Sequence, residues 1–183
     1  MKPIRNKQET NASIITKRRN RVLDRQGYIS LLFRILFLLL AGWILFTHVF
    51  LITQASGNGM FPAVKDGDLI IGFRLQQEYA KNDVVVYTAD GKTHIGRIAA
   101  GAGDVVTLDD SGTLLVNGTA QSGEIMYPTY AKEGMEYPYR VPEDEVFILG
   151  DYRTQTEDSR DFGSIPLENV QGKVITILRR RGL

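Results

Sequence analysis

The longest apolar segment of the chain runs from Ile35 to Thr53 and reads ILFLLLAGWILFTHVFLIT, nineteen residues without a charge. This length is close to the ~20 residues that cross a bilayer as a helix. A core helix of a globular protein rarely stays apolar on every side for about five turns, so the segment predicts a transmembrane helix. The alternative is a cleavable signal peptide, whose apolar region runs about 7–15 residues before a small-residue cleavage site. TQAS at 53–56 resembles such a site only weakly, and the pattern favours a retained anchor.

Beyond this run, short stretches rich in β-branched and aromatic residues alternate with turn signals, without long helical periodicity or an internal repeat. Asp90-Gly91 and Asn117-Gly118 are hairpin signals, because these residues accept the positive φ of a type I′ turn. Segment 126–142 is an aromatic, proline-bearing loop without strand or helix periodicity. The pattern predicts a mainly β fold, a barrel or folded sheet, with strands at 68–74, 83–88, 93–100, 105–108, 114–117, 145–150 and 173–179.

Charge divides the chain into two unlike parts. Residues 1–34 hold nine Lys or Arg against two acidic residues, whereas residues 54–183 hold 13 basic and 19 acidic residues. Because basic flanks stay cytoplasmic, we expect a single-pass protein of the cell membrane with its N-terminus inside and its C-terminal domain outside. The basic run directly precedes the span, which favours this topology over a nucleic-acid-binding arm. The predicted parts are a basic cytoplasmic tail at 1–34, loosely ordered over 1–27, an anchor at 35–53 and an extracellular domain at 54–183.

Cysteine and histidine usage limits what can support the exported domain. The chain has no Cys, so the domain rests on its hydrophobic core, for which about 130 residues are enough. His48 lies in the apolar run and His94 in a predicted strand, and neither stands beside Cys or paired carboxylate ligands. We therefore predict no metal site and no cofactor.

Two polar features remain as candidate sites. The turn at 57–62, GNGMFP, directly follows the anchor and has the shape of a loop that presents a side chain, yet glycines occupy its centre. Segment 149–166, LGDYRTQTEDSRDFGSIP, alternates acidic and basic residues closely, which favours interlocked Asp–Arg pairs. From the pattern alone, a structural network and a functional site are equally open for this segment.

Together the two features resemble the type I signal peptidases, membrane-anchored serine proteases that remove export signals from secreted proteins. That family carries Gly-x-Ser-Met-x-Pro-Thr after its anchor, where this chain has GNGMFPA at 57–63. Further boxes match in the same order: NDVVVY at 82–87, GRIAAGAGD at 96–104, Val116–Gly118, GDYRTQTEDSRDFG at 150–163, Ile165-Pro166 and Gly172-Lys173. The resemblance covers essentially all of 54–178 and implies a signal-peptidase-like β domain.

The departures from the family pattern fall on its two chemical groups. In the family, the serine before Met is the nucleophile, and a lysine before the Arg of a later box is its general base. Such a dyad works because a lysine in apolar surroundings loses its charge and accepts the hydroxyl proton. Here these positions are Gly59 and Gly96. The resemblance implies that the residues around these two positions are retained. They are Met60, Pro62, Arg97, Thr156, Asp158 and Arg160. Thr156 stands where the family has a serine that hydrogen-bonds the lysine.

The resemblance therefore implies a catalytically inactive, membrane-anchored homologue that binds peptides or assists assembly. Its size, single anchor and lack of Cys resemble the Gram-positive branch, in which similar non-catalytic members are associated with sortase-assembled pili. The expected partners are an exported precursor or pilin polypeptide, the membrane, and a sortase or the secretion machinery. Two alternatives stay open. One is an active signal peptidase with an unrecognised nucleophile, for which Ser56 and Ser159 are the candidate serines and Lys92 the candidate lysine base. The other is a structural partner of the secretion channel or sortase.

Overall fold

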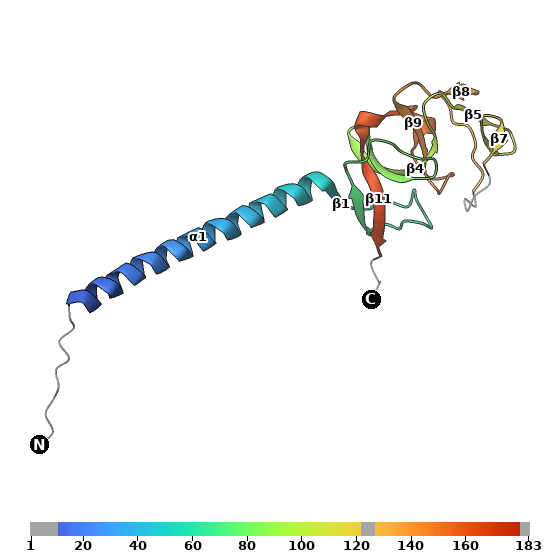
Figure 1. Cartoon of the computed structure of the whole chain (residues 1–183). Helices are drawn as coiled ribbons and strands as arrows, with labels where there is room; N and C mark the ends of the chain where they lie inside the picture. The colour runs from blue at the N-terminus through green and yellow to red at the C-terminus, as the bar shows by residue number, and fades with distance from the viewer. Residues whose placement is uncertain (1–10, 122–126, 180–183) are drawn as a thin grey trace, which may run out of the picture. The chain divides into compact units, whose positions relative to one another are not determined.

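The computed structural model describes residues 11–121 and 127–179, and the chain divides after Phe46 into two compact units. Helix α1 (Asn11–Val49) makes up the described part of the first unit (Figure 1). Its stretch Arg25–Val49 has a mean hydropathy of 2.4 and no residue buried against protein, which makes it long and apolar enough to cross a membrane. Within the described residues, this is the single helix that meets these criteria.

The helix differs from the predicted tail and anchor at both ends. The expectation that 1–27 is loosely ordered is wrong from Asn11 onward, where α1 begins; residues 1–10 lie outside the described residues. Extending an existing helix adds a hydrogen bond for each residue fixed, and no proline interrupts α1. At its other end α1 stops at Val49, and the last apolar residues enter strand β1 (Phe50–Gln54). Aromatic and β-branched residues suit either a membrane helix or a strand, so hydropathy alone did not locate this boundary.

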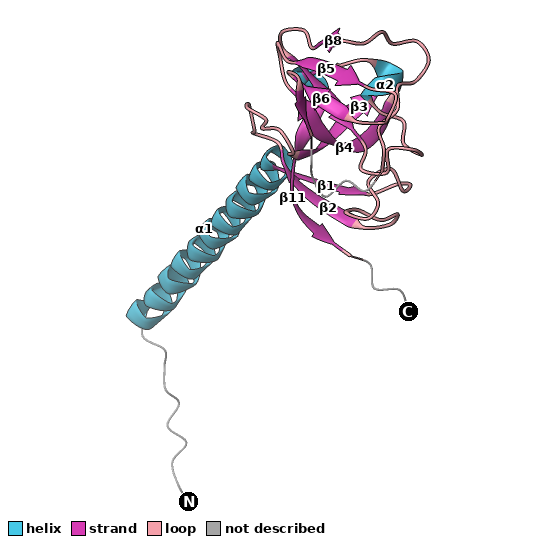
Figure 2. Ribbon diagram, turned by 90° about the vertical axis from the view of Figure 1, so that its right-hand side faces the viewer, coloured by secondary structure: helices cyan, strands magenta, loops and turns pink. Residues whose placement is uncertain are grey.

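The second unit contains two antiparallel sheets, and the predicted mainly β fold is confirmed (Figure 2). The larger sheet has the order β1-β2-β11-β3-β4-β9-β10, and the smaller has the order β7-β6-β5-β8. Strands β5, β6 and β8 gather at one end of this unit, and β1, β2 and β11 at the other. The bounds after β1 are β2 (Leu69–Phe73), β3 (Val84–Ala89), β4 (Lys92–Ala100), β5 (Val105–Leu108), β6 (Leu114–Val116), β7 (Thr119–Ala120), β8 (Tyr139–Arg140), β9 (Glu145–Leu149), β10 (Ile165–Pro166) and β11 (Val170–Leu178).

All seven predicted strands overlap observed ones, and both predicted hairpins are present. Asp90 and Gly91, at φ 47° and 69°, join β3 to β4, while Asn117 and Gly118, at φ 53° and 75°, join β6 to β7. The sequence pattern missed the two-residue strands β7, β8 and β10, which are too short to show a period. It also missed helix α2 (Ser159–Phe162) and the 3₁₀ turn Leu167–Asn169.

Three buried clusters form the core of the β unit. One lies where the smaller sheet meets β4 and β9, and a second lies within β3, β4, β9 and β10. The third joins β1 and β2 to the loop that follows β1, through Leu51, Met60, Val64 and Ile70. Because Leu51 of β1 is buried in this cluster, the β unit begins before residue 54, its predicted start.

Candidate functional site

The loop after β1 buries one hydrophobic side chain in the core and exposes its glycines at least partly to solvent. Met60 is buried in the core, whereas Gly59 is half-exposed. The backbone amide of Gly57 donates to Asp66 Oδ1 at 2.7 Å, and the amide of Tyr152 donates to the carbonyl of Gly59 at 2.9 Å. The loop is therefore attached to segment 149–166, the second polar feature of the sequence.

Gly59 lies directly against Thr156, which the structure brings to it from nearly a hundred residues further along the chain. A methyl group placed on Gly59 would lie 2.8 Å from Thr156 Oγ1 and 3.3 Å from its Cβ. Thr156 is buried, and its hydroxyl donates to the carbonyl of Glu157 at 3.3 Å. Gly150 permits this close approach, because a methyl group there would lie 2.4 Å from Thr156 Oγ1 and 2.6 Å from the Gly59 carbonyl. The position that resembles the family nucleophile is thus closely packed.

Gly96 lies in β4, and the space beside it is filled even more completely. A methyl group on Gly96 would lie 2.4 Å from Ile148 Cγ2, 3.2 Å from a ring carbon of Tyr87 and 3.3 Å from the Leu149 carbonyl. An aromatic ring from a neighbouring strand often covers a glycine in this way. The position that resembles the family base therefore has no room for a longer side chain without movement of buried residues.

Tyr87 has a hydroxyl group close to the base position, but this group does not replace a base. The side chain is fully buried, and its hydroxyl has no hydrogen-bond partner among the described residues. Burial, followed by the charges of Asp158 and Asp161, raises the pKa of Tyr87. The phenol therefore stays protonated at neutral pH and cannot accept a proton from a nucleophile.

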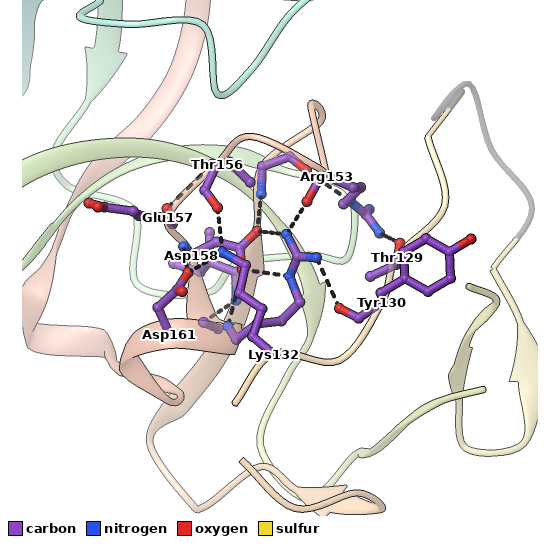
Figure 3. Close-up of polar contacts among 12 residues, drawn as sticks. Thr129, Tyr130, Lys132, Arg153, Thr156, Glu157, Asp158 and Asp161 are labelled. Atoms are coloured by element: carbon purple, nitrogen blue, oxygen red, sulfur yellow. Dashed lines mark hydrogen bonds and ion pairs between the residues drawn. The ribbon is translucent and has the colours of Figure 1, made fainter. Parts of the chain in front are cut away.

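Asp158 and Arg160 form a fully buried ion pair at the start of α2 (Figure 3). Arg160 Nε donates to Asp158 Oδ1 at 2.9 Å, and Nη2 donates to Oδ2 at 2.8 Å. Asp158 also caps α2, because its Oδ1 accepts from the Arg160 amide, and its Oδ2 accepts from the Gly150 amide at 3.1 Å. Arg160 further donates to the carbonyls of Tyr130 at 3.1 Å and Arg153 at 2.6 Å. The pair thus joins three separate segments of backbone.

A second ion pair connects β4 to the loop after β9. Arg97 donates from Nε and Nη2 to the two carboxylate oxygens of Asp151, at 2.8 and 2.7 Å, and from Nη1 to the Asn82 carbonyl at 3.0 Å. Such a two-pronged pair fixes geometry as well as charge. Pro62, the remaining scaffold residue, is exposed at the end of the glycine loop. The segment predicted to hold interlocked Asp–Arg pairs therefore contains them, with one Arg contributed from β4.

A groove of about 350 Å³ borders Gly59, and two of the three residues that could replace the dyad line it. Ser56 and Lys92 both line the groove and are exposed, but no hydrogen bond joins them among the described residues. Ser159 is fully buried, and its Oγ accepts from the Ile148 amide at 2.9 Å, which gives it a structural place. Across the described ranges, no group of three or more His, Cys, Asp or Glu side chains is placed to hold a metal.

Several residues of this site were not identified from the sequence. The sequence placed Ile148 and Tyr87 in predicted strands but did not predict that they lie beside Gly96. It placed Gly150 in a family motif but did not predict its contact with Thr156. Lys132, in the aromatic loop, donates to Asp161 Oδ2 and to the Thr156 carbonyl, both at 2.6 Å. Hydrophobic residues in a strand carry no local sign of what they cover, so only a cross-strand pairing argument around Gly96 could have found Tyr87.

The described residues thus contain an apolar helix long enough to cross a membrane and a β unit with a glycine loop beside a groove. The family model for signal peptidase, peptidase S26, matches residues 28–178. The chain therefore belongs to the signal peptidase S26 family. The comparison agrees with the resemblance at the level of the family.

Individual relatives are similar over about two thirds of this chain. It is 33% identical over 131 residues to a probable thylakoidal processing peptidase 2 of Arabidopsis thaliana, covering 64% of this chain and 35% of that one. It is 28% identical over 135 residues to signal peptidase I of Bacillus caldolyticus, covering 65% and 74%. A crystal structure of signal peptidase I from Enterococcus faecalis V583 aligns with a TM-score of 0.46 at 26% identity, covering 55% and 98%. The chain thus spans about a third of the length of the thylakoidal relative.

Proposed function

We propose that this chain is a non-catalytic member of the signal peptidase family, anchored in the membrane, that binds exported polypeptides in extended form and assists their assembly. Pilins of sortase-built surface pili are the client class that the resemblance suggests. One observation carries the proposal. Gly59 and Gly96 supply no nucleophile and no base, and Thr156, Ile148 and Tyr87 occupy the space beside them. The ion pairs that hold the surrounding loops remain.

The groove beside Gly59 suits an extended peptide because one of its walls is an open strand edge. Over residues 92–97, β4 pairs with β3, but its pairing with β9 begins only at Arg97. The backbone of Thr93–Ile95 therefore has no strand partner on the side away from β3 among the described residues, and these residues line the groove. An extended chain placed there gains main-chain hydrogen bonds, the mode by which sheet edges capture peptides. Loss of a nucleophile leaves this mode intact.

The proposal is tested with full-length protein in detergent micelles and fluorescent peptides that copy an export-signal cleavage region or a pilin segment. Such peptides should bind and remain uncut at high protein concentration over long incubation, as followed by mass spectrometry. Two peptide series are compared, one N-methylated at the odd-numbered residues and the other at the even-numbered residues. One series should lose binding and the other should keep it, because a strand pairs through the N–H groups of every second residue on one side. Equal binding of both methylated series would contradict recognition by the open edge.

A second candidate function, an active peptidase with a different nucleophile, is favoured by one observation. Ser56 and Lys92 line the same groove. Against it, both are exposed, whereas a Ser–Lys dyad depends on a desolvated lysine. Site-specific cleavage by the unmodified protein that is lost in Ser56→Ala or Lys92→Ala would establish this alternative and exclude the non-catalytic one.

Orientation in the membrane provides a further prediction. Nine basic residues precede the apolar run, so the N-terminus should be cytoplasmic and the β unit extracellular. Protease added to intact protoplasts should digest the β unit and spare an N-terminal tag until the membrane is permeabilised. Recovery of the β unit as a free, processed protein in the medium would instead indicate a cleaved signal sequence.

A further inference from the structure

A second, larger cavity lies beyond the end of the glycine loop, where Pro62 and Ala63 line it. Its volume is about 700 Å³, within the range of small-molecule and side-chain binding sites, and it shares no lining residue with the groove. Its walls come from β4, from the turn before β6, from segment 127–129 and from the loop after β9. Part of the lining is apolar, through Ile98, Ala99, Leu114 and Pro128.

Arg153 lines this cavity. Figure 3 shows its side chain beside Thr129. The residue is 5% exposed. Its Nε donates to the Gly150 carbonyl at 2.8 Å, and its Nη1 donates to the Thr129 hydroxyl. A guanidinium group has five N–H donors. Among the described residues, the Arg153 side chain has no other hydrogen-bond acceptor. Its other three N–H donors are therefore available to an occupant of the cavity.

Arg153 has no ion-pair partner among the described residues. Asp151 forms an ion pair with Arg97, and Asp158 forms an ion pair with Arg160. Among the described residues, no carboxylate lies within ion-pair distance of Arg153, and the two carboxylates whose charges act on it, those of Asp158 and Asp151, are each paired with another arginine. A buried, unpaired charge is costly. Burial lowers the pKa of Arg153 to about 10, which still leaves the group charged at neutral pH.

We propose that this cavity binds a carboxylate, held by the free N–H groups of Arg153 with its apolar stem against Ile98, Ala99 and Leu114. One carboxylate would supply the ion-pair partner that Arg153 lacks among the described residues. A planar guanidinium presents paired donors that match the two oxygens of a carboxylate. The carboxylate comes either from an acidic side chain of a polypeptide or from a small organic acid. The inference is independent of whether the chain cleaves or binds peptides at Gly59.

The test uses isothermal titration calorimetry on full-length protein in detergent micelles at pH 7 and constant ionic strength. The probes are acetyl-Gly-Glu-Gly-amide, its Gln counterpart, propionate and inorganic phosphate. The Glu peptide should bind roughly 10–100-fold more tightly than the Gln peptide, the difference expected for charge-assisted hydrogen bonds. If propionate binds as tightly as the Glu peptide, a small organic acid is a sufficient ligand. If propionate binds more weakly, the ligand is an acidic side chain of a polypeptide. Equal binding of the Glu and Gln peptides, or binding of phosphate alone, would overturn the proposal.

Variants locate the binding. Arg153→Gln should lose roughly 10–100-fold in affinity for the Glu peptide. Lys65→Gln is the matched control, because it removes one positive charge from an exposed residue that lines neither the cavity nor the groove, and the affinity should change little. Unchanged affinity in a folded Arg153→Gln protein would refute the assignment. If that variant does not fold, the Glu-versus-Gln comparison on unmodified protein still decides whether a carboxylate is bound.

Discussion

Replacement of Arg160 by methionine is expected to lower the melting temperature of the β unit by roughly 10–20 °C, which corresponds to about 3–5 kcal/mol. Arg160 and Asp158 are both almost completely buried, and the substitution leaves the Asp158 carboxylate without its partner. The carbonyls of Tyr130 and Arg153 also lose their donors. Removal of one member of a buried pair is costly mainly because the remaining charge stays buried. Calorimetry of the full-length chain measures the shift.

Lys132→Met is the matched control for Arg160→Met. Lys132 pairs with Asp161 in the same part of the fold, at 2.6 Å, but the two side chains are 29% and 31% exposed. Solvent screens such a pair, and the variant also removes the hydrogen bond from Lys132 to the Thr156 carbonyl, so the total loss should be only about 1–2 kcal/mol. Similar small shifts in both variants would mean that the buried network does not stabilise the fold. A chain beginning at residue 54 is unsuitable for this measurement, because it lacks β1 and the buried Leu51.

Restoring the two family residues together, Gly59→Ser with Gly96→Lys, is expected to yield a destabilised protein that still leaves signal-peptide substrates uncut. The structure places Ile148 Cγ2 2.4 Å and the Leu149 carbonyl 3.3 Å from the first side-chain atom at Gly96. Overpacking of this kind typically costs about 1–3 kcal/mol and shifts the backbone. A misplacement near 1 Å is already costly to catalysis, so the new dyad should not align.

The steric part of this prediction is separated from the chemistry by alanine variants. Gly96→Ala should destabilise the chain by about 1–3 kcal/mol, because its methyl group meets buried neighbours. Gly101→Ala, next to the end of the same strand, is the control. A methyl group there meets nothing within 4 Å, and the residue does not have a positive φ, so its stability should change by less than about 0.5 kcal/mol. Equal stability of both variants, or efficient cleavage by the double revertant, would show that the base position is open.

The sequence by itself determined the apolar helix, the seven longer strands and the family of this protein. The uncharged run from Ile35 predicts the membrane-type helix, and the alternation between turn signals predicts the seven longer strands. The hairpins at Asp90-Gly91 and Asn117-Gly118 were predictable because the positive φ of their turns is a local requirement. The ordered boxes identify the family, and the absence of side chains at Gly59 and Gly96 can be read directly from the letters.

Only the tertiary structure decided what surrounds those glycines. Ile148 and Tyr87 fill the base position from strands β9 and β3, and Thr156 reaches Gly59 from a distant loop. The lack of an ion-pair partner for Arg153 likewise follows only from the structure, in which Asp151 and Asp158 pair with other arginines. Local propensity depends on neighbours in the chain, whereas packing and charge balance depend on residues far apart in sequence. For that reason the end of α1 at Val49, where strand pairing with β2 takes over, was also settled by the fold.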